Sequence, residues 1–497
     1  MDGAIWVLIL ALILFATILL IHHFIDVNLP LTRLPVTWFY ASWLIGLFLL
    51  SMPIFKYFES FDAINGAYVV GILFAYSVGS VSAAFWGRRS KAKILSSQLS
   101  IENQSLPKIS AKFLFVLLAL GLVGTSMLML NTVLGGSLSL ADRLDSENFS
   151  AIRLEHMIST ESRIGIFFGP ATLMSSIGGL GVAFFFYLRG SRSEAFSGLK
   201  GMYGMALLVL AINIIIGLVG FGSRMFAVFS ILVAFLAFVE GRWSIGEHLI
   251  LKRISLKGFI VISFSTIATL VILWFAATLF LEKRVQNQDP QTLLFRTHRA
   301  SFAPTVYALT RDDKAAQYFM FSLSYLTTPI PTLTFYLDLP ESRQPGPFFG
   351  EYNFPAIARW LRRLTFSGNP YSWDSARVDI FKPLGDIGFG TNVWATLVRD
   401  LIADFTKIGA LIFLSVFGFF TQRVFDRQQE SPSVRLAGLM VYLRLILIFA
   451  GMISILFMPQ VHWSFYLAIF VVAFARKKMK KSQILPRPLS QIMTIKR

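Results

Sequence analysis

Residues 258–290 read GFIVISFSTIATLVILWFAATLF-LEKRVQNQDP, an apolar run followed at once by a polar one. The apolar part, 258–280, is long enough to cross the roughly 30 Å hydrocarbon core of a bilayer as a helix. The polar part opens a segment, 281–400, that is rich in Arg, Asp, Trp, Pro and Gly. We expect the specific work of the chain in this segment, because apolar runs surround it on both sides.

The composition predicts a membrane protein. Hydrophobic residues make up 55% of the 497 residues and charged residues only 14%, whereas a soluble domain of this size needs more surface charge. Runs of about 20 apolar residues recur, and helices are the natural way for them to cross lipid. We therefore predict an all-α polytopic fold with about eleven transmembrane helices: 4–21, 36–55, 64–87, 113–130, 164–188, 202–219, 225–240, 258–280, 402–421, 439–458 and 463–475.

The expected organisation has four parts. Transmembrane helices one to eight fill 1–280 and carry a smaller outer loop at 131–163. The large loop covers 281–401, helices nine to eleven cover 402–475, and a basic tail covers 476–497. The first run has no basic stretch before it and no small-residue cleavage site after it, so we predict a retained span rather than a cleaved signal peptide.

Basic residues predict the orientation. Clusters of Lys and Arg follow the third, fifth, seventh, ninth and eleventh predicted spans, so all of them fall on one side. The positive-inside rule makes that side cytoplasmic. The N-terminus and segment 281–401 are then expected outside, with the C-terminus cytoplasmic. The same rule accounts for the net charge of +18 through loop orientation and anionic lipid, so we expect no nucleic-acid partner.

Two kinds of chemistry are excluded or disfavoured. The chain has no cysteine, which excludes disulfides, thiolate metal sites and cysteine nucleophiles. Its six histidines are scattered without paired spacing, so we predict no metal site.

The large segment is predicted to be partly helical. Asn353 to Gly368 has the apolar spacing of an amphipathic helix that would lie at a membrane interface. Thr292 to Ser301 is predicted to be helical too, with Arg296 and Arg299 neighbours on one surface and His298 close by. Several prolines, from Pro329 to Pro347, favour turns in the middle.

Arginines are the first candidates for a site. Arg224 stands in the only polar break between the sixth and seventh predicted spans, where a guanidinium suits phosphate but could equally reach lipid headgroups. Arg399 and Asp400 open the ninth span, and Asp404 and Lys407 follow them at helical spacing. This group could be an ion-pair stripe facing the helix bundle, or part of an outer cavity that holds a diphosphate.

Two other residues have alternative interpretations. His298 is the best candidate for a general base, because His titrates near neutral pH, although an ordinary solvated His is the alternative. Arg444 is either a functional charge within the tenth span or a sign that the span begins later.

Three features together resemble one family. They are Gly222-Ser223-Arg224 between central spans, the large outer loop, and Asn392-Val393-Trp394-Ala395-Thr396-Leu397 leading into Asp404-Phe405-Thr406-Lys407-Ile408-Gly409. They resemble the O-antigen polymerases, the Wzy-type oligosaccharide repeat-unit polymerases. The family pattern near the late span is similar to Asp-Phe-Gly-x-x-Gly, and this chain departs from it where Thr406-Lys407 replaces the first Gly.

The resemblance implies a GT-C-like glycosyltransferase in the bacterial inner membrane. It would polymerise undecaprenyl-diphosphate-linked repeat units into surface polysaccharide at the periplasmic face, with a chain-length regulator as a possible partner and no cofactor. In this reading Arg224, Arg399, Arg296 and Arg299 stabilise the diphosphate. His298 activates the acceptor hydroxyl, with Asp374 or Asp379 as rivals. Glycan contacts are assigned to Asn392, Tyr325 and Trp373, with anchoring at the membrane interface as the alternative role of the aromatic residues.

Two other functions stay open at this stage. A ligase that transfers finished glycan from the same lipid carrier would share the arginines and the large loop. A lipid-linked sugar transporter or flippase would instead favour symmetry between halves and polar residues at mid-span, which this sequence has in small number.

Overall fold

The computed structural model describes residues 2–25, 31–58, 62–95, 109–135, 168–191, 199, 201–217, 224–244, 289–340, 347, 348, 350, 353, 354, 396–456, 461 and 463–473. Within them the regular secondary structure is helical apart from two short strands. The elements are α1 (Asp2–Ile25), η1 (Leu31–Arg33), α2 (Pro35–Ser51), β1 (Phe55–Tyr57), α3 (Ala63–Leu95), α4 (Ala111–Gly135), α7 (Phe168–Gly190), α8 (Tyr203–Ile215), α9 (Arg224–Ser244), α11 (Pro290–His298), β2 (Ala300–Phe302), α12 (Pro304–Thr310), α13 (Lys314–Thr327), α14 (Pro329–Asp338), α17 (Leu397–Glu430) and α18 (Val434–Phe449).

The predicted membrane character is confirmed at a coarse level. Among the described residues, six helices are long and apolar enough to cross a membrane: Ala4–Ile25, Ala63–Gly87, Ala111–Leu130, Pro170–Gly190, Ala227–Ser244 and Leu397–Glu430. The predicted spans near α2, α8 and Trp463–Ala473 are apolar helices too, but each is shorter than 18 residues. The predicted span 258–280 lies outside the described residues, so the count of eleven stays a prediction.

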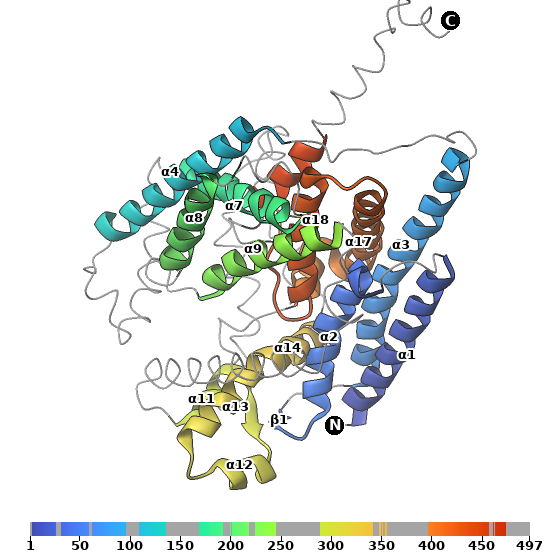
Figure 1. The fold of residues 1–497 in the computed structure, drawn as a ribbon. Helices are drawn as coiled ribbons and strands as arrows, with labels where there is room; N and C mark the ends of the chain where they lie inside the picture. The colour runs from blue at the N-terminus through green and yellow to red at the C-terminus, as the bar shows by residue number, and fades with distance from the viewer. Residues whose placement is uncertain are drawn as a thin grey trace, which may run out of the picture.

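The helices form a bundle around α18. Helices α4, α7, α8 and α9 lie on one side of it, and α1, α2, α3 and α17 lie on the other (Figure 1). Helix α18 packs against α2, α7, α9 and α17. Nearly all of its side chains are buried, as expected for an apolar helix surrounded by others.

Close packing between the long helices depends on small residues. A Cβ at Gly79 or at Gly418 would overlap the backbone where α3 and α17 pack together, and the atom next to Gly418 is the carbonyl oxygen of Tyr76. Helices α4 and α7 approach in the same way at Gly121 and Gly178. Because lipid supplies no hydrophobic driving force between membrane helices, such close backbone contact is a main source of their association.

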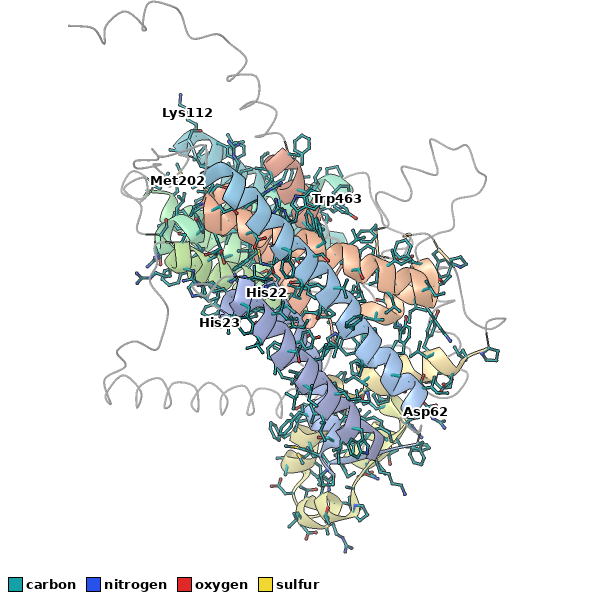
Figure 2. The ribbon with its side chains drawn as sticks, turned by 90° about the vertical axis from the view of Figure 1, so that its right-hand side faces the viewer. His22, His23, Asp62, Lys112, Met202 and Trp463 are labelled. Atoms are coloured by element: carbon teal, nitrogen blue, oxygen red, sulfur yellow. The ribbon has the colours of Figure 1, made fainter. Side chains whose placement is uncertain are left out.

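A small lobe stands at one end of the bundle. We use the word lobe for residues 289–327 together with β1, which pairs antiparallel with β2 so that Phe55 faces Phe302. Figure 1 shows residues 289–327 of the lobe in yellow, below α14, and β1 in blue near the lower end of α2. Figure 2, from the side, shows Asp62 at the start of α3 close to the same end. The lobe has its own hydrophobic cluster, to which Leu294, Tyr318 and Phe321 belong.

Local sequence explains the lobe's helices. The Asp289 side chain accepts a hydrogen bond from the Thr292 backbone N–H at 2.9 Å, and Pro290 occupies the first turn of α11. Arg299 ends the helix with φ 47°. The predicted helix Thr292–Ser301 is therefore confirmed only as far as His298, since Ala300 and Ser301 belong to β2. Arg299 lies beyond the last helical residue, so it does not share a regular helix surface with Arg296.

The middle of the large segment differs from the prediction at its prolines, and its predicted second helix stays untested. Pro329 and Pro331 were expected in turns, but both lie in the first turn of α14, where a missing N–H costs nothing. The predicted helix Asn353–Gly368 lies outside the described residues except for Asn353 and Phe354, which are not helical. Helix α17 begins at Leu397, before the predicted start of the ninth span at residue 402.

We expect Gly418→Val to destabilise the bundle by about 1–3 kcal/mol, because the added side chain must push α17 away from the backbone of α3. Thermal unfolding of the purified protein in detergent measures this. The control is Gly71→Val on the partner helix α3, where nothing lies within 4 Å of an added Cβ. Equal stability of the two variants would contradict the close packing described here.

Candidate functional site

The first turn of α17 is buried in the protein rather than exposed to solvent. The Thr396 side chain caps the helix by accepting a hydrogen bond from the Arg399 backbone N–H at 3.2 Å. The Leu397 N–H donates to the carbonyl of Ala450 at 2.9 Å. The first turn of α17 therefore lies against the chain that leaves α18.

Arg399 and Asp400 form a buried ion pair. The Arg399 Nε and Nη2 atoms both donate to Asp400 Oδ1, at 3.1 and 2.8 Å. The two side chains are only 1% and 2% exposed. Removing one member of such a pair leaves a buried charge without compensation, which typically costs 3–5 kcal/mol.

Tyr336 of α14 lies in the same electrostatic environment. Burial raises the pKa of its hydroxyl well above the ordinary value. The Arg399 guanidinium opposes this pKa rise, whereas Asp400 and Asp404 reinforce it. Three charged groups of α17 therefore act on one hydroxyl of the large segment.

Asp404 joins three parts of the chain. Its Oδ2 atom accepts hydrogen bonds from the backbone N–H and the Nδ2 of Asn353, at 2.9 and 2.8 Å. Ser454 donates to Asn353 Oδ1 at 2.9 Å. All three side chains are fully buried. Asn353 thus connects the large segment to α17 and to the chain beyond α18.

Helix α18 ends earlier than the sequence suggested. The tenth span was predicted to reach residue 458, but the helix stops at Phe449 and residues 451–456 are not helical. The Gly451 N–H donates to Ser42 Oγ of α2 at 3.1 Å, and a Cβ at Gly451 would press on the backbone of that residue. Non-helical backbone inside a membrane protein needs such internal partners.

A bend at Thr406 divides α17. Its backbone has φ 69° and ψ 173°, a region that is almost reserved for glycine. After the bend, Lys407 Nζ donates to the carbonyl of Leu337 in α14 at 2.7 Å, and Tyr68 donates to the Lys407 carbonyl at 2.7 Å. A continuous stripe of Asp400, Asp404 and Lys407 was one expectation for a regular helix, and the bend shows that it is wrong.

We define the residues Arg399, Asp400, Asp404, Asn353 and Ser454 as the α17 cluster. It combines one cation, two carboxylates and neutral hydrogen-bonding groups in a buried position. Such an arrangement can hold a guanidinium in a fixed direction, and a fixed guanidinium suits recognition of an anionic group such as a phosphate.

His298 lies elsewhere, inside the lobe. Its imidazole is fully buried, stacks edge-on against Tyr325 at 4.8 Å, and lies 5.3 Å from the Phe321 ring. Neither ring nitrogen has a hydrogen-bond partner among the described residues. Burial lowers the pKa of His298 to about 3, so the ring is neutral at physiological pH. The structure therefore brings His298 and Tyr325 together, but in a hydrophobic cluster separate from the core that surrounds α17.

The other predicted site residues are spread over the chain. Arg296 is exposed on α11 and Arg299 is half-buried at its end. Arg224 is the first residue of α9, and its side chain lies outside the described part. Asn392 and Trp373 also lie outside the described residues.

A second buried charge group involves Arg444, which lies inside α18 and not at its end. Its Nη1 atom is 3.0 Å from Glu240 Oε2 of α9, and its Nη2 donates to the Arg33 carbonyl at 3.3 Å. The guanidinium lies 4.4 Å from the Trp243 ring. This group ties α18 to α9 and to the turn before α2, which is a structural role.

Sequence reasoning singled out Arg399, Asp400 and Asp404 but missed Asn353, Ser454 and Tyr336. Asn353 was assigned to the start of a helix, and its Asp404 partner is 51 residues away. A signal was present for Thr406, since it departs from glycine in the motif that the sequence resembles.

No protein-family model, no curated protein and no solved structure matches this chain. The contacts described above are what supports a functional proposal.

We expect Thr406→Gly to stabilise the protein by roughly 1 kcal/mol, because glycine adopts this backbone conformation without strain. The midpoint of thermal unfolding in detergent measures the effect. Ser415→Gly, in the regular part of α17, is the control and should destabilise by about 0.5 kcal/mol. A loss of stability in both variants would contradict the strained geometry at Thr406.

We expect acid to weaken the lobe through His298. Its pKa is about 3 in the folded protein, against about 6.5 when unfolded, so only the unfolded state takes up a proton between these values. Stability is fully present above pH ~6.5 and falls as the pH drops toward ~3. His298→Phe should flatten this dependence in thermal unfolding across that range. An unchanged slope would show that His298 is not the titrating group.

Proposed function

We propose that this chain is a membrane glycosyltransferase that polymerises lipid-diphosphate-linked oligosaccharide repeat units. The observation that carries the proposal is the α17 cluster, in which a buried arginine is oriented by Asp400 at the start of a membrane-spanning helix. Arg399, Asp400 and Asp404 of the cluster fall within the stretch 392–409, whose sequence resembles the polymerase family. The glycine-like backbone of Thr406 adds support, because the family pattern has glycine at that position.

The chemistry needs few groups from the protein. The donor is a glycan on undecaprenyl diphosphate, and the acceptor is a second lipid-linked repeat unit. The bond between the anomeric carbon and the diphosphate oxygen breaks, and a bond to the acceptor hydroxyl oxygen forms. The hydroxyl proton passes to a general base, and undecaprenyl diphosphate leaves with the electron pair. The transition state therefore develops negative charge on the diphosphate, which a cation stabilises.

Arginines supply that cation in the proposal. Arg399 is held by Asp400, and Arg224, which follows Gly222-Ser223 in the sequence, is the first residue of α9. Arg296 is exposed on the lobe and can meet an incoming headgroup. Because Arg399 is buried, a substrate reaches it only when the chain around the cluster opens.

The general base is better assigned to a carboxylate than to His298. The imidazole has no solvent contact, and its lowered pKa makes it a weak base. Asp374 and Asp379, outside the described residues, are the carboxylates of the large segment that we propose for this step.

The proposal sets the lobe and the start of α17 on the periplasmic face of a bacterial inner membrane. The basic loops and the basic C-terminal tail then face the cytoplasm, as the positive-inside rule requires. Both substrates are in the membrane, and a chain-length regulator is a proposed partner.

The test is complementation of a host strain deleted for this gene, read as the length distribution of its surface glycan. We expect Arg399→Ala to reduce polymer formation by roughly 10²–10³-fold, the usual effect of losing one group that stabilises transition-state charge. Arg224→Ala should also shorten the chains. Arg435→Ala, an exposed arginine at the start of α18, is the matched control and should leave the ladder unchanged.

A double variant separates catalysis from folding. Arg399→Met with Asp400→Asn removes both buried charges together, so it avoids the penalty of an unpaired charge. We expect it to accumulate at normal levels and still fail to make polymer. Normal ladders from this variant would contradict the role of Arg399.

The phenotype of the deleted host distinguishes a polymerase from a ligase. If the host without the gene attaches only single repeats, the gene encodes a polymerase. If that host attaches no glycan at all, the gene encodes a ligase.

A further inference from the structure

A pocket lined by hydroxyl groups lies inside the helix bundle, and none of its lining residues belongs to the α17 cluster. Its walls come from α7, α8, α9, α18 and the helix Trp463–Ala473. The polar lining residues are Ser175, Ser176, Asn213, Ser230, Tyr442 and Ser464. None of the thirteen lining residues carries a formal charge. The pocket therefore suits a neutral polar group and not a phosphate.

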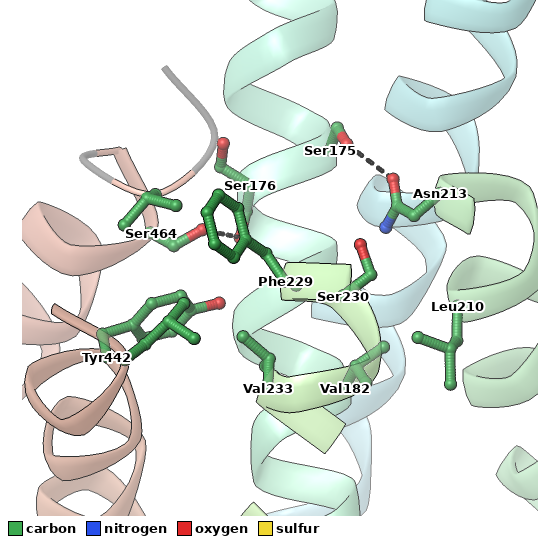
Figure 3. Close-up of a pocket in the computed structure, with 13 residues that line it drawn as sticks. Ser175, Ser176, Val182, Leu210, Asn213, Phe229, Ser230, Val233, Tyr442 and Ser464 are labelled. Carbon is green, nitrogen blue, oxygen red and sulfur yellow. Dashed lines mark hydrogen bonds between the residues drawn. The ribbon is translucent and has the colours of Figure 1, made fainter. Parts of the chain in front are cut away.

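The polar groups converge on the same space. Figure 3 shows Tyr442 and Asn213 pointing into the pocket from opposite sides. Ser175 Oγ donates to Asn213 Oδ1 at 3.2 Å, which fixes the amide and leaves its Nδ2 as a donor directed to the pocket. Ser464 Oγ donates to the carbonyl of Ser176 at 3.1 Å. Hydroxyls and an amide offer both donors and acceptors, the set that matches sugar hydroxyls.

The remaining wall is apolar and close-fitting. Phe229 and Val233 of α9 line one side. A Cβ at Gly179 would lie 3.1 Å from the Tyr442 hydroxyl, so glycine there keeps the pocket open. Apolar walls with a few placed polar groups are typical of small-molecule sites. The cavity of about 50 Å³ holds a few water molecules or the hydroxyl-bearing edge of a sugar ring.

The pocket adjoins the elements assigned to the reaction. Phe229 and Ser230 lie within two turns of Arg224, the first residue of α9. Helix α18 carries Tyr442 in the pocket wall and ends at Phe449, next to the Ala450 carbonyl that accepts the Leu397 N–H of α17. One helix therefore connects the pocket to the start of α17.

We propose that this pocket binds the hydroxyl edge of a neutral sugar in the lipid-linked repeat unit, and so contributes to recognition of the glycan separately from the diphosphate. The proposal rests on the glycosyltransferase function above. It predicts that variants of the pocket weaken binding of the glycan-bearing lipid and leave binding of the bare diphosphate lipid unchanged.

The experiment uses the purified full-length protein in detergent and two probes. One is the single-repeat undecaprenyl-diphosphate lipid isolated from the gene-deleted host, and the other is undecaprenyl diphosphate without sugar. Asn213→Leu and Tyr442→Phe should each weaken retention of the glycan lipid roughly tenfold, the effect of losing one or two buried hydrogen bonds. Tyr40→Phe is the control, because it removes a buried hydroxyl that bonds to Ser77 away from the pocket.

The outcomes separate this proposal from the function it rests on. Equal retention of the glycan lipid by wild type and by both pocket variants would mean that the pocket holds water only, and would overturn the proposal. Equal loss of both probes would mean a general structural defect and would overturn it too. Failure of the wild-type gene to restore polymer in the deleted host would instead overturn the proposed function.

Discussion

The pair of hydrogen bonds from Asn353 to Asp404 holds the distinctive part of this molecule together. A buried carboxylate needs compensation, and Asn353 supplies two donors from backbone and side chain. Ser454 then fixes the amide from the other side. These contacts bring a residue of the large segment, the first turns of α17 and the chain beyond α18 to one point. The Arg399–Asp400 pair is formed one turn away on the same helix, in a region that these contacts keep in place.

Apolar helices and buried charges coexist here because every charge in the α17 cluster has a nearby partner. Both irregularities of the helices lie close to the cluster in sequence: Asp404 stands two residues before the bend at Thr406, and Ser454 stands five residues after the end of α18 at Phe449. Both irregularities are compensated locally, by Ser42 at Gly451 and by Tyr68 at Lys407. Irregular backbone beside buried charged groups inside a helix bundle is typical of functional sites in membrane proteins.

Much of the helical fold could be predicted from sequence, because long apolar runs have few alternatives in lipid. Helices such as α1, α3 and α4 agree with their predicted spans within a few residues at the start. The strand pairing between Phe55 and Phe302 could not be predicted, since each strand is only three residues long and its partner is distant in sequence.

Sequence could identify only the charged residues of the candidate site, because charged residues are rare next to apolar runs. Arg399, Asp400 and Asp404 stood out because acids and bases are unusual beside an apolar run. Asn353 and Ser454 are common polar residues whose importance comes from their long-range contacts. His298 shows the opposite case, since its residue type suggested a base and only the fold revealed an aromatic enclosure that lowers its pKa.

The most direct measurement is a reaction with the purified protein and the single-repeat undecaprenyl-diphosphate lipid alone, followed by mass spectrometry of the products. The account predicts lipid-linked glycans of two and more repeats, with one undecaprenyl diphosphate released for each new glycosidic bond. Unchanged substrate, or free glycan released by hydrolysis without any longer product, would contradict it.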